Sequence, residues 1–544
     1  MTIHPAPQIS DPGVSRPSRE PRVLAPLSRN LIIFFLFLAT VLLLQLFSGA
    51  YSSEFGAYPD EPAHYVTSLM VREYITGPSP IWPMKFAENY YAHYPKVAFG
   101  HWPPLFYFVQ GLWMILFSAT RTSVRLELAF TTAALAFSLF WEAKRWFGEV
   151  TGVLAGLLVV CLPLVQASAD QEMAEMLLAL TCFWSAIYFA RYLDSERLSD
   201  SMWFAVFFSL AVLTKGSAWL LVFIPPIALV LTKKLYLLLH RSFWFAIGLI
   251  ALCCLPWQLL TFQVAARGWT GGTQPSLQYT SSALLQFGRI FIFIAGPVLA
   301  AVAAFGIVIT VIVAFFRTRR VASGPAVMLA LLLGDWVFHS VVPAGVEDRK
   351  LIMAVPALIL FLFAGGNWIA NRLPLRGELH EYRAHLVAAV LAIVFFAQVF
   401  TVPRQMRFGY REAAQFITSD PALRGATILA SSESAGEGLL ISEIAMREPR
   451  PRDTIIRGTK ALANVDWTGT EYRSLFSTSQ QVLQFIQESH IGVVVTDNYP
   501  PLANFAHTRL LLDTIKQNPG RFRLLRTFQG NAPAGHISVF QVVS

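Results

Sequence analysis

Apolar runs of membrane-spanning length follow one another along most of this chain. From residue 31 to about residue 402 they recur at roughly 17 to 25 residues each, the length that crosses a hydrocarbon core of about 30 Å as a helix. The chain is 55% hydrophobic and 14% charged, whereas about a quarter of the residues in soluble chains are charged. We therefore predict a polytopic α-helical membrane protein.

Basic residues indicate how these helices are oriented, because loops rich in Lys and Arg stay in the cytoplasm. We interpret the net charge of +9 in this way rather than as a sign of nucleic-acid binding. Residues 1–30 are rich in Pro, Ser and Arg, which predicts a disordered cytoplasmic arm and not a signal peptide. All four cysteines lie inside apolar runs, so neither disulfides nor a zinc site is indicated.

The stretch Leu105–Ser118 decides the topology. It follows Pro103 and Pro104 and is short for a span. If it crossed the membrane, four basic loops would face outward: EAKRWFG, TKKL, RTRR and NRLPLRGELHEYR. We therefore predict an interfacial or re-entrant helix. About eleven spans remain, near residues 31–48, 124–142, 150–169, 173–190, 201–214, 216–232, 243–262, 284–315, 325–342, 351–370 and 384–402.

In this topology, the acidic and basic residues that are unusual for a membrane protein lie together on the outer face. A large first outer loop, residues 49–123, contains the sequence YPDEPAHYV at its start. A junction near residue 170, the loop 263–283 and the sequence GVEDRK face the same side. The collected residues are Asp60, Glu61, His64, Lys96, His101, Asp170, Glu172, Glu175, Lys215, Arg267, Glu347, Asp348, Arg349 and Lys350.

The composition changes after about Val402 to that of a soluble domain. The runs ATILASS and IGVVVTD are typical of buried strands in an α/β sheet, HISVFQV alternates like a strand, and SQQVLQFIQESH has helical periodicity. Eleven spans place this domain, residues 403–544, on the outer face. It contains no phosphate-binding glycine loop and no catalytic-triad spacing, which favours a cap or an acceptor-recognition domain.

Several stretches, taken in order, resemble the GT-C superfamily of lipid-dependent glycosyltransferases. The resemblance is to the branch of protein O-mannosyltransferases and the aminoarabinose transferase of lipid A, and it covers about residues 30 to 370. The stretches are PDEPAHY, HWPPLFYF, RWFGEVTGVLAGLLVVCLPLVQASADQEMAEM, AVLTKGSAWLLVFIPP and EDRKLIMAVPAL. The lipid A branch commonly has a lysine where this chain has His101.

The resemblance implies a GT-C membrane domain over residues 31–402 and a sugar donor carried on a polyprenyl phosphate such as an undecaprenyl phosphate. Transfer would occur on the extracytoplasmic side of the plasma (inner) membrane, as part of cell-envelope glycosylation. The resemblance also implies a catalytic aspartate in the first loop, matching Asp60, and an acid after the third helix. Glu175 matches that acid best, with Asp170 and Glu172 as rivals. The sugar and the acceptor do not carry over, because they vary within the family.

Glycosyl transfer explains why these residue types are needed. A carboxylate near the acceptor takes the hydroxyl proton, which contributes roughly 10²- to 10⁴-fold. We expect Asp60 to do so, with Glu61 orienting it or binding acceptor hydroxyls. Cations stabilise the leaving phosphate; Arg349 and Lys350 are the first candidates, and His101 and Lys96 are weaker ones.

Further roles follow for the remaining candidates. His64, Glu175, Asp170 and Glu172 are candidates for binding the acceptor or supporting the site. Magnesium or manganese is possible, because Asp60, Glu61 and Glu175 supply the hard oxygen ligands that these ions prefer.

Each of these residues also has a purely structural interpretation. Asp60 and Glu61 could be solvated loop acids in a proline-bounded turn, and His64 could be structural. The EDRK sequence could be a cluster of snorkelling side chains. The acids near residue 172 could simply complement a helix dipole.

Three functions compete. The first is an inverting glycosyltransferase that uses a polyprenyl-phosphate sugar. The second is a transporter or flippase of a lipid-linked sugar, which would usually show two related halves; no such repeat is visible. The third is a non-catalytic membrane scaffold, which the intact acidic and basic positions disfavour.

Overall fold

The computed structural model describes residues 26–78, 81–98, 100–265, 275–374, 379–404, 409–465, 472–499, 505–530 and 535–543. Residues 1–25 of the predicted arm, and Arg267 with its neighbouring glycines, lie outside these ranges. The first helix begins at Pro26, inside the range predicted as an arm. Proline is tolerated at this position because the first N–H groups of a helix have no intrahelical partner.

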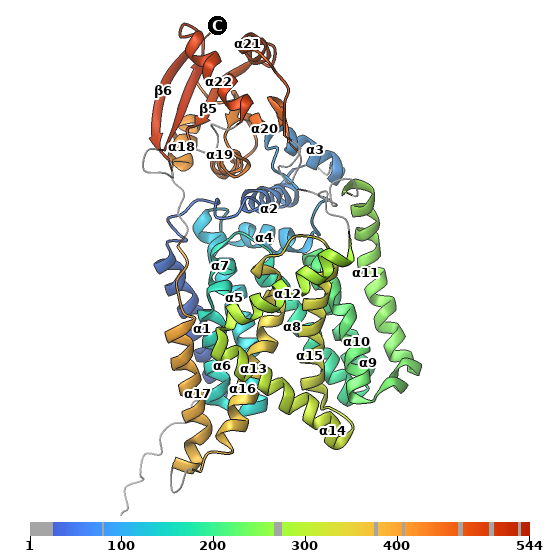
Figure 1. Ribbon diagram of the computed structural model, residues 1–544. Helices are drawn as coiled ribbons and strands as arrows, with labels where there is room; N and C mark the ends of the chain where they lie inside the picture. Colours follow the sequence, from blue (N-terminus) through green and yellow to red (C-terminus); the bar gives the residue numbers. More distant parts are fainter. Residues whose placement is uncertain are drawn as a thin grey trace, which may run out of the picture.

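The membrane region consists of long helices together with shorter helical segments (Figure 1). They are α1 (Pro26–Ser48), α5 (Arg121–Phe147), α6 (Glu149–Cys161), α7 (Pro163–Asp170), α8 (Glu175–Ser195), α9 (Leu198–Thr214), η1 (Gly216–Phe223), α10 (Ile224–Thr232), η2 (Leu235–Leu239), α11 (Arg241–Ala265), α12 (Leu277–Ala295), α13 (Pro297–Ile307), η3 (Val308–Val313), α14 (Ala314–Thr318), α15 (Ser323–Val341), η4 (Asp348–Ala354), α16 (Val355–Ala370) and α17 (Leu379–Gln398).

Eight helical segments of the described chain are long and apolar enough to cross a membrane, or nine if the bent pair α6–α7 counts as one span. The shorter apolar helices α9 and η1–α10 coincide with the two remaining predicted spans. The chain is therefore a multi-pass helical membrane protein, as predicted.

One predicted span, 284–315, is wrong as a single helix. The chain breaks at Gly296, whose φ of 76° lies in the region that favours glycine, and α13 starts at the following Pro297. The dipeptide Gly-Pro was visible in the sequence and accounts for the break.

The first loop contains three helices, α2 (Glu61–Thr76), α3 (Pro83–His93) and α4 (Leu105–Leu116). In Figure 1, α2 and α4 lie across the ends of the long helices, between them and the C-terminal domain. With its 12 residues, α4 is about 18 Å long, which is too short to cross a bilayer. This agrees with the predicted interfacial or re-entrant helix.

The C-terminal region is a small α/β domain. Its five-stranded sheet has the order β2-β1-β5-β7-β6; β2, β1 and β5 are parallel, and β7 is antiparallel to both its neighbours. The predicted strands near 426, 491 and 536 and the helix near 479 are confirmed. The elements are α18 (Tyr410–Ser419), β1 (Thr427–Ser431), α19 (Ser434–Arg447), β2 (Thr454–Arg457), α20 (Gly458–Ala461), β3 (Ala463–Asn464), β4 (Arg473–Ser474), α21 (Ser479–Glu488), β5 (Ile491–Asp497), α22 (Ala506–Gln517), β6 (Phe522–Gln529) and β7 (His536–Val542).

The first loop and the C-terminal domain share one hydrophobic core. Tyr65 and Leu69 of α2 are buried in the same cluster as Leu440 of α19 and Val493 of β5. A buried ion pair between Arg121 and Glu443 also joins the start of α5 to α19. The loop and the domain therefore lie on the same end of the membrane region and are packed together.

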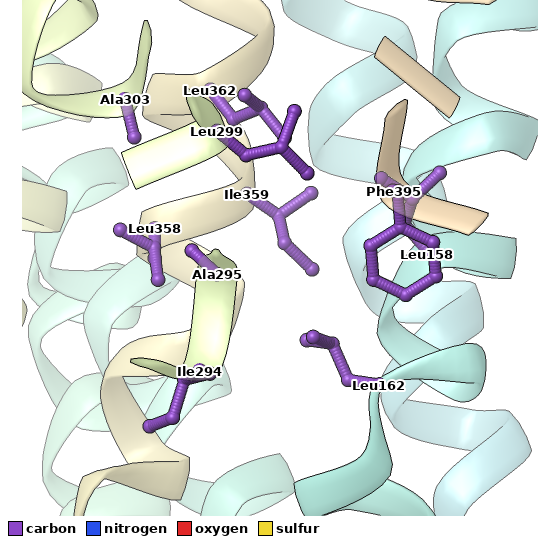
Figure 2. Close-up of a pocket in the computed structure, with 10 residues that line it drawn as sticks. All are labelled: Leu158, Leu162, Ile294, Ala295, Leu299, Ala303, Leu358, Ile359, Leu362 and Phe395. Atoms are coloured by element: carbon purple, nitrogen blue, oxygen red, sulfur yellow. The ribbon is translucent and has the colours of Figure 1, made fainter. Parts of the chain in front are cut away.

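A small apolar cavity of about 20 Å³ lies between α6, α12, α13, α16 and α17. Figure 2 shows the ten side chains that line it, all of which end in carbon: Leu158, Leu162, Ile294, Ala295, Leu299, Ala303, Leu358, Ile359, Leu362 and Phe395. A bound water or phosphate needs polar partners, and these side chains offer none. We interpret the cavity as a packing void between helices.

Helices α13 and α16 are in backbone contact at two glycines. A Cβ on Gly306 would lie 1.9 Å from the carbonyl oxygen of Phe361, and one on Gly365 would lie 2.3 Å from that of Val302. Small residues allow membrane helices to approach this closely.

We expect Gly306→Ala to destabilise the protein by roughly 1–3 kcal/mol, because the methyl group forces α13 and α16 apart. Gly248→Ala is the matched control, since nothing lies within 4 Å of that position. Thermal unfolding in detergent should show a lower Tm for the first variant only. Equal Tm values for both variants would contradict the close packing.

Candidate active site

Glu61, the second acid of the YPDEPAHYV stretch, is fully buried and fully hydrogen-bonded. Its Oε1 accepts from the backbone N–H groups of Ala57 (2.8 Å) and Tyr58 (3.1 Å). Its Oε2 accepts from Arg125 Nη2 (3.1 Å) and from the backbone N–H of Glu172 (2.7 Å). Glu61 thus joins the first loop to α5 and to the turn between α7 and α8.

Asp60, the first acid, has a different environment. It precedes α2 at the N-cap position, and its side chain makes no capping hydrogen bond. Burial raises the pKa of Asp60, while the positive charges of Arg349, Lys215 and Lys96 act in the opposite direction. The residue as a whole is half-buried.

Arg349 is held by a ring of polar groups at the start of η4. Its Nε donates to Glu347 Oε2 (2.6 Å), and its Nη2 donates to the Tyr58 hydroxyl (2.5 Å). The guanidinium also lies over the Tyr58 ring, 3.9 Å from its centroid. The Tyr58 hydroxyl donates in turn to Glu347 Oε2 (3.1 Å). These contacts place the arginine directly beside the turn that carries Asp60.

Glu175 brings a second cation to the same place. Its Oε1 accepts from Lys215 Nζ (2.6 Å) and from Arg349 Nη1 (3.3 Å). Only 4% of the Glu175 side chain is exposed, against 23% for Lys215 and 18% for Arg349. The carboxylate is therefore buried behind two cations whose outer surfaces remain accessible.

Lys96, also in the first loop, lies near enough to Asp60 for its charge to lower the pKa of that carboxyl. Its Nζ donates to Ser434 Oγ (3.3 Å) at the start of α19. Burial and the neighbouring Arg457 lower the pKa of Lys96 to about 8. His101 is partly buried and lies edge-on to the Trp102 ring, and burial lowers its pKa too.

His64 belongs to an aromatic cluster rather than to the polar site. Its ring stacks on Trp102 at 4.4 Å and is hydrogen-bonded through Nδ1 to the Tyr107 hydroxyl (3.0 Å). Burial, together with the charge of Lys215, lowers the pKa of His64 to about 3. The imidazole is therefore neutral and supports the fold of the loop.

The remaining predicted residues lie around this centre. The Lys350 Nζ donates to the carbonyl oxygens of Ala344 and Gly345 and so closes its own loop. The Glu172 carboxylate accepts from Gln110 and is fully buried, which raises its pKa to about 8. Asp170 is buried at the end of α7, near Arg125. None of these three is held beside Asp60 by a contact that the described residues show.

The arrangement of the candidate metal ligands Asp60, Glu61 and Glu175 shows whether they could share a cation. Both oxygens of Glu61 are occupied by N–H donors, and Glu175 Oε1 is paired with Lys215 and Arg349. Within the described ranges, no three His, Cys, Asp or Glu side chains form a group suited to a metal ion. Asp60, Glu61 and Glu175 as arranged do not fit a shared cation.

Sequence reasoning missed two residues of this site. Tyr58, directly before Pro59-Asp60, was not considered, although an aromatic residue adjacent to paired acids was a usable signal. Arg125 was given no role in the site, whereas it is 1% exposed and paired with Glu61. Lys215 was expected on the outer face, but only the structure shows its contact with Glu175.

Comparison with known proteins places this geometry in context. A sequence model described as dolichyl-phosphate-mannose-protein mannosyltransferase matches residues 101–259. This match includes His101, Glu175 and Lys215 but ends well before Arg349. No curated protein sequence matches the chain significantly.

Solved structures share the fold over nearly the whole chain. The apo ArnT of Cupriavidus metallidurans is similar with a TM-score of 0.56 and 13% identity, covering 95% of this chain and 98% of ArnT. ArnT bound to undecaprenyl phosphate is similar with a TM-score of 0.51 and 12% identity, covering 94% and 97%.

An oligosaccharyltransferase of Archaeoglobus fulgidus, tethered to an acceptor peptide, is similar with a TM-score of 0.53 and 12% identity, covering 89% of this chain and 71% of that protein. The chain therefore has the fold of these GT-C glycosyltransferases, and its residues 101–259 resemble the protein mannosyltransferases.

Proposed function

We propose that this protein is an inverting glycosyltransferase, which moves a sugar from a polyprenyl-phosphate donor to an acceptor hydroxyl on the outer face of the plasma (inner) membrane. The observation that carries the proposal is the contrast between the two neighbouring acids. Glu61 accepts hydrogen bonds from four N–H donors. The Asp60 side chain, by contrast, makes no capping hydrogen bond and lies near three cations.

In this proposal Asp60 is the general base. It accepts the acceptor's proton while the acceptor oxygen attacks the anomeric carbon, and the bond from that carbon to the phosphate oxygen breaks. Attack from the face opposite the phosphate inverts the anomeric centre. The polyprenyl phosphate leaves with the bonding electron pair, and cations stabilise the negative charge on its oxygens.

Arg349 and Lys215 are the cations best placed to bind that phosphate. Both donate to one oxygen of Glu175, so their separation is held constant while their outer faces stay accessible. Arginine offers paired donors that match phosphate oxygens. Lys96 contacts Ser434 of the C-terminal domain and lies near enough to Asp60 to act on its charge, and His101 lies edge-on to Trp102.

The similar proteins support the choice of donor. ArnT has been solved with undecaprenyl phosphate, and the archaeal oligosaccharyltransferase with a dolichol-phosphate and an inhibitory peptide. Incubating the purified protein in nanodiscs with radiolabelled polyprenyl-phosphate sugars tests the proposal. We expect release of polyprenyl phosphate with transfer or hydrolysis of the sugar. Movement of intact donor between leaflets without bond cleavage would favour a flippase instead.

The orientation can be tested separately. We expect a reporter fused after Ser544 to be extracytoplasmic, because the C-terminal domain packs on the first outer loop. A phosphatase reporter that requires export should be active there. Strong activity of a reporter that works only in the cytoplasm would invert the topology.

Asp60→Asn preserves the size of the side chain but removes its ability to accept a proton. We expect transfer to fall by at least about 10²-fold, while donor binding and Tm stay close to those of the unchanged protein. The comparison variant is Glu61→Gln, which should mainly lower Tm, because it leaves Arg125 buried without its partner charge. Full transfer by Asp60→Asn would refute the assignment.

Arg349→Gln should weaken polyprenyl-phosphate binding by about ten- to a hundredfold, because a charge-assisted hydrogen bond contributes roughly 1.5–3 kcal/mol. Lys350→Gln is the matched control, since Lys350 donates to carbonyl oxygens of its own loop. Binding to the two variants can be compared by native mass spectrometry. Equal affinities would assign Arg349 a structural role only.

A further inference from the structure

A second polar cleft lies at the opposite end of the membrane helices from Asp60. Helix α8 has Glu175 at one end and Asp194 near the other, and its 21 residues span about 30 Å. Around that far end lies a cleft of about 720 Å³ between α5, α8, α10 and the α14–α15 connection, adjoining one of about 900 Å³ beside α9. In Figure 1, α14 lies at the end of the molecule remote from the C-terminal domain.

Four basic side chains from separate parts of the sequence line this cleft. They are Arg145 of α5, Arg191 of α8, Lys234 after α10 and Arg320 after α14. We refer to the site formed by these four residues as the basic cleft. Three of them come from the loops EAKRWFG, TKKL and RTRR, whose charge determined the predicted topology. The fold thus brings basic residues from loops that are far apart in the sequence to a single cleft.

The acids in the cleft do not neutralise its arginines. Glu142 accepts from the Trp146 indole (2.8 Å), and Asp194 accepts from Ser323 (2.6 Å). The salt bridges nearby join Arg29 and Lys144 to Glu149, and Lys234 to Glu196.

Arg191 instead lies over the Tyr188 ring, 5.0 Å from its centroid. Within the described ranges, the guanidinium groups of Arg145, Arg191 and Arg320 therefore have no carboxylate partner. The cleft contains four cations and only two acids, so it carries a net positive charge.

The position of the basic cleft identifies the ligand class. Trp141 and Trp184 line the adjoining cleft beside α9, and Trp141 is 47% exposed. Tryptophan is enriched where lipid head groups meet the hydrocarbon. Unpaired guanidinium groups at this level suit the phosphate of an anionic lipid, because their paired donors match its oxygens.

We propose that the basic cleft binds the phosphodiester head group of an anionic phospholipid in the leaflet opposite the catalytic site. About 30 Å of membrane helix separates this cleft from Arg349, so it is distinct from the donor's phosphate site. The proposal is independent of the proposed reaction, since lipid binding can be measured without turnover.

The test compares two double variants of equal charge. Arg145→Gln with Arg320→Gln removes two arginines that line the cleft. Arg197→Gln with Arg241→Gln removes two exposed arginines at the nearby ends of α9 and α11, which do not line it. The full-length protein is titrated with phosphatidylglycerol or phosphatidylcholine in detergent, and bound lipid is counted by native mass spectrometry.

We expect the cleft variant to bind phosphatidylglycerol about thirty-fold more weakly, equivalent to about 2 kcal/mol, and the control by less than about threefold. Equal Tm values in phosphatidylcholine would show that both variants fold. Arg191→Gln, as a single change, should act in the same direction. Equal losses in both double variants, no loss in the cleft variant, or displacement of the lipid by millimolar inorganic phosphate would overturn the proposal.

Discussion

The buried pair of Glu61 and Arg125 is the interaction on which the rest of the outer site depends. Their side chains are 0% and 1% exposed, and the carboxylate also accepts three backbone N–H groups from two separate segments. A buried charge pair is costly to break because removal of one partner leaves the other uncompensated. The pair therefore keeps the first loop, α5 and the α7–α8 turn in one arrangement, and Asp60 takes its position from that arrangement.

A second buried carboxylate organises the cations. Glu175 holds Lys215 and Arg349 through one oxygen, and Tyr58 with Glu347 completes the surroundings of the guanidinium. Such a network presents positive charge at a constant position before any ligand arrives. Preorganised charge of this kind stabilises a developing anion without further rearrangement. In the proposed reaction it would meet the phosphate as the sugar leaves.

The C-terminal domain is packed against the first loop and the membrane region. It shares a hydrophobic core with α2, and the buried pair of Arg121 and Glu443 connects it to α5. Lys96 contacts Ser434 at the start of α19 and affects the charge balance at Asp60. An acceptor that reaches Asp60 would therefore approach a surface formed partly by this domain.

Hydropathy determined the membrane class and the approximate positions of the spans, because it is a property of consecutive residues, whereas Asp60 was chosen because PDEPAHY resembles a glycosyltransferase motif. The break at Gly296 was also present locally, as a Gly-Pro pair. Only the tertiary structure distinguished the two adjacent acids. Glu61 is buried because its partner Arg125 lies 64 residues away in sequence, and Arg349 meets Glu175 across 174 residues. Burial and pairing at such separations depend on how helices pack, which no local pattern records.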